Sequence, residues 1–195
     1  ARMPPMVSFI APSGTGKTTL IEAVVRILSE RGLRVAVVKH DAHRLKLDTP
    51  GKDSYRFRQA GAWRTLVASD HELGLFGKLE GSSSLGGLVT EFLTQADLVL
   101  LEGFRSTTLS AIRVQRSGVR DVEWSPGRVR VVAIASDTPT DSDLPHLSLD
   151  SPEEVADFLL SHIVEGAQRR QITGLVAAHD GVKEAIIERS IRALA

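Results

Sequence analysis

The residues most able to do chemistry form one short run near the start of the chain, where Gly14 and Gly16 are followed by Lys17 and Thr18. Glycines let backbone N–H groups converge on an anion, because no side chain blocks the approach. The lysine that follows supplies a mobile positive charge, and the hydroxyl beside it can bind a hard cation such as Mg²⁺. This order of residue types predicts a phosphate-binding loop.

The complete loop covers residues 11–18 and matches the Walker A pattern, except that Ala11 stands at the first glycine position. That position needs mainly a small residue at the end of a strand, so the departure matters little. A glycine-rich turn with a surface lysine is the ordinary alternative, but the full spacing between a strand and a helix argues against it. The residues expected to bind nucleotide phosphates are Ser13, Gly14, Thr15, Gly16, Lys17, Thr18 and Thr19.

The patterns on either side of the loop predict the elements that hold it. Residues 7–10 are apolar, and apolar residues three and four apart follow over 18–31. A buried strand therefore enters the loop and an amphipathic helix leaves it, ended by Gly32. A second strand over 34–39 completes a strand–helix–strand crossover. The predicted fold class is α/β, with a mostly parallel sheet flanked by helices as in P-loop NTPases.

The rest of the chain extends this sheet and adds a short β insertion in the middle. Residues 41–52 are polar and predict a loop, and Ser151 begins a helix as N-cap, with a proline and a capping-box glutamate after it. Further helices are predicted at 53–62 and from after the glycines at 86–87 to residue 93. Further strands are predicted at 65–69, 72–76, 98–101, 111–115 and 130–135. We expect a nucleotide-binding domain over residues 6–164 and a C-terminal helical extension over 165–195.

Carboxylates follow two of the predicted parallel strands, at the edge where open α/β sheets bind their ligands. Glu102 follows the apolar run 98–101, and Asp41 follows the second strand. Either could hold Mg²⁺, partly through water, and Glu102 could orient an attacking water. A solvated strand-end acid is the alternative for both. The predicted metal ligands are Thr18, Asp41 and Glu102, and the predicted catalytic residues are Lys17 and Glu102.

Several other polar residues carry weaker predictions. Asp137 follows the strand at 130–135 and could accept hydrogen bonds from N1 and the exocyclic amine of guanine. His40 and His43 have no third nitrogen or sulfur ligand at metal-binding spacing, so no zinc site is expected. A basic cluster near the loop could meet an anion or could be a solvated helix face; its members are Lys52, Arg56, Arg58 and Arg64.

Composition narrows the classes of partner. Lysine plus arginine equals aspartate plus glutamate at 24 each, so no overall charge recruits nucleic acid. The absence of cysteine excludes disulfides and thiolate metal sites, and it fits a reducing compartment, so a cytoplasmic location is expected. Neither a signal segment nor an apolar run of membrane-spanning length is evident, and no membrane association is expected.

Five segments, in order and spacing, resemble the MobB family. They cover residues 13–19, 38–41, 48–54, 60–62 and 98–104. The resemblance extends over about residues 6 to 164. It is most specific at 50–54, since Walker loops occur in very many families. Residues after 166 match nothing in the family.

The resemblance implies a homodimeric GTP-binding accessory protein with weak GTPase activity in molybdenum-cofactor maturation. The implied partner is a MobA-type guanylyltransferase, which attaches GMP to molybdopterin to make the guanine dinucleotide; other cofactor-insertion proteins are further possible partners. By position, the loop residues inherit phosphate and magnesium roles. Glu102 and Asp41 inherit the acidic roles, and Asp137 inherits the contact to the base.

Three other classes remain as alternatives. A P-loop ligase resembling dethiobiotin synthetase would share the loop and the strand-end Glu-Gly, but residues 48–54 favour the MobB family. A small-molecule kinase would need an arginine-rich lid, for which the chain offers only its basic cluster. A partition-type ATPase would carry a lysine at the start of the loop, where this chain has Ala11.

Overall fold

The structure, a computed structural model, describes residues 3–39, 48–77, 84–104, 108–120 and 129–167. It divides into two compact units, which we call the sheet unit (residues 3–40 and 95–195) and the hairpin unit (residues 41–94, with 1–2). The predicted extension at 165–195 lies almost wholly outside the described residues. Its helical character and the domain boundary at 164/165 therefore stay predictions.

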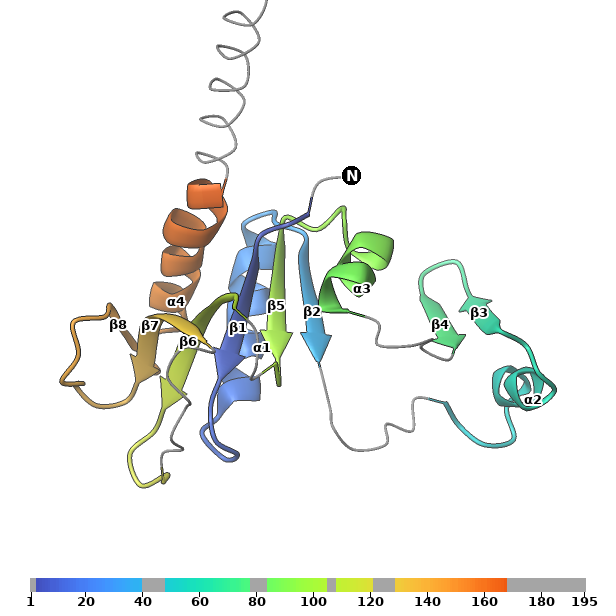
Figure 1. Ribbon diagram of the computed structural model, residues 1–195, viewed down its shortest axis with the longest axis horizontal. Helices are drawn as coiled ribbons and strands as arrows, with labels where there is room; N and C mark the ends of the chain where they lie inside the picture. Colours follow the sequence, from blue (N-terminus) through green and yellow to red (C-terminus); the bar gives the residue numbers. More distant parts are fainter. Residues whose placement is uncertain (1–2, 40–47, 78–83, 105–107, 121–128, 168–195) are drawn as a thin grey trace, which may run out of the picture. The chain divides into compact units, whose positions relative to one another are not determined.

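The sheet unit is built on six parallel strands in the order β2-β5-β1-β6-β7-β8 (Figure 1). This arrangement confirms the predicted α/β class, and every pairing in the six-stranded sheet is parallel. The strands are β1 (Met6–Ile10), β2 (Val35–Lys39), β5 (Leu98–Glu102), β6 (Ser110–Gln115), β7 (Arg130–Ser136) and β8 (His146–Ser148).

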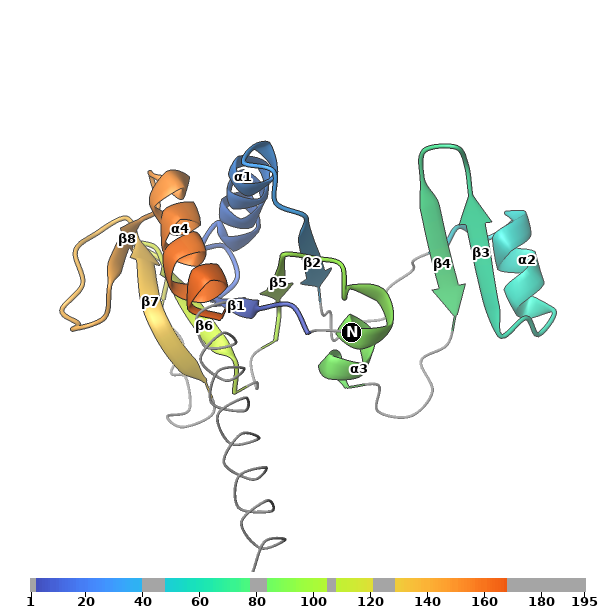
Figure 2. The ribbon, with the colours of Figure 1, turned by 90° about the horizontal axis from the view of Figure 1, so that it is seen from above.

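Helices cover one face of this sheet. Helix α1 (Lys17–Glu30) and helix α4 (Pro152–Phe158), which continues as the π-helix η1 (Leu159–Val164), lie side by side there (Figure 2). Their apolar stripes pack on alternate residues of the strands, and Val24 and Leu28 of α1 belong to the same buried core as Phe9 and Leu100. Burial of these side chains, at roughly 25 cal/mol per Å², is the main stabilising term for the unit.

Helix α1 ends as its sequence predicts. Gly32 has φ of +85°, in the left-handed region that glycine tolerates, and the Leu33 N–H donates to the Leu28 carbonyl. The predicted capping box of α4 is wrong: the Ser151 side chain makes no capping hydrogen bond. Glu154 instead accepts from the Ser148 N–H, because its carboxylate reaches the end of β8.

The hairpin unit contains the predicted β insertion. Strands β3 (Arg64–Ala68) and β4 (Leu73–Gly77) form an antiparallel pair, with α2 (Asp53–Gln59) before them and α3 (Leu85–Phe92) after them. Among the described residues, no helix has the length and apolar character needed to cross a membrane.

Candidate nucleotide-binding site

The loop between β1 and α1 has the backbone conformation that phosphate binding requires. Gly14 and Gly16 both have φ of +83°, which side chains disfavour. Thr15 is buried between them, and its hydroxyl donates to the Pro12 carbonyl, which closes the loop on itself. Ala11 is also buried, so a small residue suits the end of β1.

Helix α1 begins at Lys17 and carries no acidic residue in its first turn. The first N–H groups of a helix have no intrahelical acceptor, and the helix dipole places partial positive charge there. The loop therefore ends at a helix terminus that is suited to bind an anion. Ser13 and Thr19 are exposed on either side of it.

Glu102 is the point at which the site residues converge. The Lys17 Nζ lies 2.9 Å from Glu102 Oε1, and the Thr18 hydroxyl donates to the same oxygen at 2.9 Å. Lys39 Nζ lies 3.9 Å from the other oxygen, Oε2. The two residues predicted to be catalytic, together with the predicted threonine ligand, thus occupy one cluster.

Strand register explains this convergence. All five residues of β5 are buried, and β5 lies between β1 and β2, with Glu102 opposite Phe9 on one side and Lys39 on the other. The carboxyl ends of parallel strands share one edge, so the last residue of β5 must face the loop that follows β1. Asp97, at the other end of this strand, pairs instead with Arg34 at 3.1 Å.

The surroundings of Glu102 keep it ionised. Burial raises the pKa of this carboxyl, but the hydrogen bonds from Lys17 and Thr18 and the charges of Lys17 and Lys39 outweigh burial, so its pKa lies below the ordinary value. Only 10% of the side chain is exposed. A carboxylate and a hydroxyl 2.9 Å apart offer the hard oxygen ligands that suit Mg²⁺, which completes its shell with phosphate oxygens and water.

Asp137 lies directly after β7, and its carboxylate is held by Ser117, which follows β6. Ser117 donates its N–H to Oδ1 at 2.8 Å and its hydroxyl to Oδ2 at 2.7 Å. These hydrogen bonds, with the charge of Arg116, lower the pKa of Asp137. Each carboxylate oxygen keeps further acceptor capacity, so the geometry is compatible with a contact to a base.

The sequence analysis did not identify three residues that the structure places at the candidate site: Lys39, Arg116 and Ser117. Lys39 is the last residue of β2, and its pairing with Glu102 depends on a strand order that the sequence does not give. Arg116 follows β6, and its Nε donates to the Thr15 carbonyl at 2.9 Å. The Arg-Ser-Gly turn after an apolar strand was the signal available for Arg116 and Ser117.

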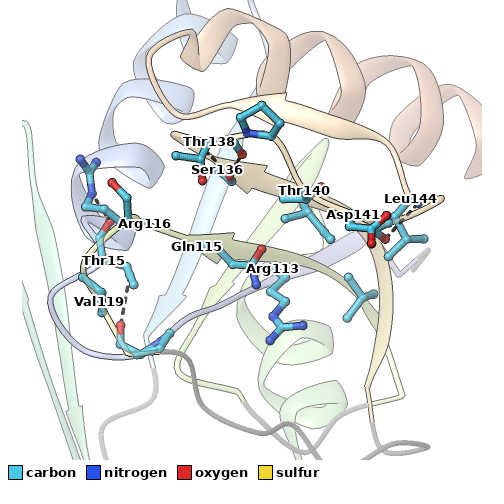
Figure 3. Close-up of a pocket in the computed structure, with 16 residues that line it drawn as sticks. Thr15, Arg113, Gln115, Arg116, Val119, Ser136, Thr138, Thr140, Asp141 and Leu144 are labelled. Atoms are coloured by element: carbon cyan, nitrogen blue, oxygen red, sulfur yellow. Dashed lines mark hydrogen bonds between the residues drawn. The ribbon is translucent and has the colours of Figure 1, made fainter.

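A pocket of about 550 Å³ opens beside the loop in the sheet unit (Figure 3). Its walls come from the loop, from β6 and β7, and from residues 138–144. Asp41, His40 and His43 lie outside the described residues, so their predicted roles stay predictions.

The predicted basic cluster lies in the hairpin unit, where local contacts engage its arginines. Arg58 Nη2 lies 3.0 Å from the Asp48 carboxylate, and the Asp48 side chain, only 5% exposed, also accepts from Thr49 N–H and Ser54. Arg64 pairs with Glu91. Arg56 pairs with Asp53, and Lys52 precedes α2 as its N-cap residue.

Comparison with known families decides the membership of this chain. The model of the family described as "MobB: Molybdopterin guanine dinucleotide synthesis protein B" matches residues 6–137, which is more than half of the 195 residues. The chain belongs to the MobB family. The matched region includes the phosphate loop, Glu102, Arg116 and Asp137, whereas the pocket wall at residues 138–144 lies beyond it.

Two relatives in the MobB family align with this chain over most of their length. The molybdopterin-guanine dinucleotide biosynthesis adapter protein of Escherichia coli K12 is 37% identical over 166 residues, covering 81% of this chain and 93% of that protein. The adapter protein of Haemophilus influenzae is 32% identical over 156 residues, covering 80% and 87%.

Solved MobB structures share the fold. A structure of molybdopterin-guanine biosynthesis protein B superposes with a TM-score of 0.66 at 31% identity, covering 80% of this chain and 98% of that one. Bacillus subtilis MobB gives a TM-score of 0.64 at 26% identity, covering 82% and 98%. The likeness therefore extends over nearly the whole of those chains.

Proposed function

We propose that this chain is a GTP-binding adapter with weak GTPase activity in the biosynthesis of molybdopterin guanine dinucleotide. The observation that carries the proposal is the convergence of Lys17 and Thr18 on Glu102 beneath a phosphate loop, in a member of the MobB family. The relatives from Escherichia coli and Haemophilus influenzae are named as adapters in that synthesis. The cytoplasm stays the predicted location.

The chemistry available to the site favours binding over rapid hydrolysis. Lys17 would leave Glu102 to contact the terminal phosphates, and the amides from Gly14 to Thr18 would hold the remaining oxygens. Thr18 and Glu102 would hold Mg²⁺, with Asp41 as a further proposed ligand. When bound, the metal would neutralise charge on the phosphates. Glu102 would then orient water, and this single carboxylate accounts for a weak activity.

Guanine preference is proposed from Asp137. A carboxylate accepts from both N1–H and the exocyclic amine of guanine, whereas adenine presents no such pair of donors. The carboxylate is held in place by Ser117. This supports GTP as the ligand.

Calorimetric titration with Mg–GTP and Mg–ATP tests both parts of this proposal. Wild-type protein should bind GTP more tightly than ATP, and Lys17→Ala should reduce GTP binding below detection, because it removes the cation nearest the terminal phosphates. Arg26→Ala, which removes an exposed cation of α1, is the matched control and should retain wild-type affinity. Retained affinity in Lys17→Ala would contradict the phosphate-loop assignment, and a preference for ATP would favour the ligase or kinase alternatives.

Self-association is proposed from the hairpin unit. Cross-strand partners in β3 and β4 share a face, so Leu66 and Leu75 lie together, and Ala68 and Leu73 lie on that same face one pair further along. The exposed fraction is 64% for Leu66, 39% for Leu75 and 75% for Leu73. We call these four residues the leucine face. A two-stranded sheet is marginal alone, so a second copy that covers this face would stabilise it, which supports a homodimer.

The remaining partners are proposed from the family. An adapter in guanine dinucleotide synthesis must meet the guanylyltransferase that performs it, and we propose a MobA-type enzyme as that partner. Other cofactor-insertion proteins are a secondary proposal.

A further inference from the structure

The guanidinium of Arg116 lies directly against the phosphate loop. Its Nε donates to the Thr15 carbonyl, and its Nη2 lies 3.2 Å from the position that a Cβ atom at residue 16 would take. A side chain at Gly16 would therefore meet this arginine as well as an unfavourable φ of +83°. The Thr15 bond uses one of the five N–H donors of the guanidinium. A second cation thus stands at the loop, besides Lys17.

The two cations lie on opposite sides of the loop's strand. Lys17 contacts Glu102 on β5, whereas Arg116 extends from the end of β6, and β1 lies between β5 and β6 in the sheet. The oxygen ligands suited to Mg²⁺, Thr18 and Glu102, are on the β5 side. A bound nucleotide would place its metal and terminal phosphates there. Its nucleoside must then extend the other way, past Arg116 and over β6 and β7.

The pocket beside the loop lies along that path. It begins at Pro12 and Thr15, passes Arg116, and continues to Ile134 of β7 and to residues 138–144 (Figure 3). Its volume of about 550 Å³ is within the range of small-ligand sites. Apolar walls from Ile134 and Leu144 accompany hydroxyls, a combination that suits a sugar and a planar polar ring.

One hydroxyl of this pocket shows unused bonding capacity. Thr140 Oγ1 is buried from solvent, and among the described residues it has no hydrogen-bond partner. Thr140 lines the pocket, with its side chain among those drawn there (Figure 3). Rotation about the Cα–Cβ bond of Thr140 would turn this hydroxyl into the pocket, where a ligand could supply the hydrogen-bond partner that it lacks.

We propose that Arg116 is a nucleotide-binding residue that contacts the phosphate nearest the ribose, and that the pocket beside it receives the nucleoside. This inference rests on the proposed nucleotide-binding function and adds the direction in which the ligand lies. Arg116 supplies charge at the junction of loop and pocket, and Thr140 supplies a hydrogen bond to the nucleoside.

Titration of Arg116 variants with Mg–GTP and with Mg–tripolyphosphate tests the first half. Arg116→Gln should weaken both ligands by about 10- to 100-fold, since a charge-assisted hydrogen bond to a phosphate common to both is lost. Arg116→Lys should recover most of that loss because it keeps the charge. Arg26→Gln, which removes an exposed arginine of α1, should bind as wild type does.

The lysine variant separates a ligand contact from a structural brace. If Arg116 only holds the Thr15 carbonyl, the lysine and glutamine variants will be equally impaired, and that result would overturn the proposal. Wild-type affinity in Arg116→Gln would overturn it too. If wild-type protein binds neither ligand, the proposed function itself fails, which is a distinguishable outcome.

Thr140 variants test the second half. Thr140→Trp fills the pocket and should weaken Mg–GTP by at least about tenfold, while Mg–tripolyphosphate, which has no nucleoside, should bind as before. Thr140→Val keeps the shape and removes the hydroxyl, so it should weaken Mg–GTP by several-fold, on the order of one neutral hydrogen bond. Unchanged GTP affinity in both variants, or an equal loss for both ligands, would show that the nucleoside lies elsewhere.

Discussion

The two compact units differ in the side chains that lack a partner within the described part of the chain. In the sheet unit, the charged groups of the site satisfy one another: Glu102 holds Lys17 and Thr18, and its side chain is 10% exposed. In the hairpin unit, charged groups such as Asp48 are also paired, but Leu66 and Leu73 remain 64% and 75% exposed. In the sheet unit, Lys17 and Thr18 can exchange their contact with Glu102 for a contact with a polar ligand. The hairpin unit leaves apolar side chains exposed, which is the basis of the proposed homodimer.

The largest effect is expected from substitutions that separate self-association by the hairpin unit from nucleotide binding by the sheet unit. Leu66→Asp and Leu73→Asp place charge on the leucine face and should convert the proposed dimer to a monomer, because an unpaired charge in an apolar interface is strongly unfavourable. Size-exclusion chromatography with light scattering measures the change in mass. Affinity for Mg–GTP should stay within about twofold of wild type, since these residues belong to the other unit.

A charge placed off this face provides the control. His71→Asp adds the same charge at the exposed β3–β4 turn and should leave the oligomeric state unchanged. A leucine variant that stays dimeric would contradict assembly through the leucine face. A variant that becomes monomeric and also loses GTP binding would contradict the separation of roles.

A second prediction concerns stability within the hairpin unit. Asp48→Ala should destabilise the protein by about 2–4 kcal/mol, because it leaves Arg58 without its buried partner and removes acceptors for Thr49 N–H and Ser54. Asp53→Ala, which breaks the exposed pair with Arg56, should cost no more than about 0.5 kcal/mol. Urea denaturation measures both changes. Equal effects would show that the buried carboxylate has no special role.

The smallest expected effect concerns the pH dependence of the sheet unit. The pKa of Glu102 is lowered on folding, so its contribution to stability is present above the ordinary glutamate pKa and is lost as pH falls through the lower folded value. Glu102→Gln should remove that contribution, which is on the order of 1 kcal/mol. Melting temperatures of both proteins between pH 7 and pH 3 should converge as the pH falls. A constant difference would contradict the ionised pair.

Sequence patterns predicted the parts of this fold that depend on local spacing. The phosphate loop, Gly32 at the end of α1 and the apolar strand before Glu102 are set by residues a few positions apart, and the structure contains all three. Strand β8 was missed because its three residues are too short for a period to show. The predicted capping box at Ser151 does not form, because the Glu154 carboxylate accepts from the Ser148 N–H, outside the helix.

Contacts between distant segments were the part that the sequence could not supply. Lys39 meets Glu102 only because β2 and β5 are neighbours, and Arg116 reaches Thr15 across 101 positions. Each depends on strand order, which no local pattern encodes. The convergence of Lys17 and Glu102 was expected in outline from the rule that ligands bind at the carboxyl ends of parallel strands.

The bond between Lys17 and Glu102 makes the carboxylate an internal competitor for the lysine. If a phosphate binds as proposed, it must displace this carboxylate, so its measured affinity would be the intrinsic affinity multiplied by the fraction of molecules in which Lys17 is already released. Mg²⁺ would favour that release by taking the carboxylate oxygen that Lys17 gives up. Metal and nucleotide would then strengthen one another's binding, and by thermodynamic linkage each would raise the other's affinity by the same factor. A nucleotide without metal would meet Glu102 as a repelling charge.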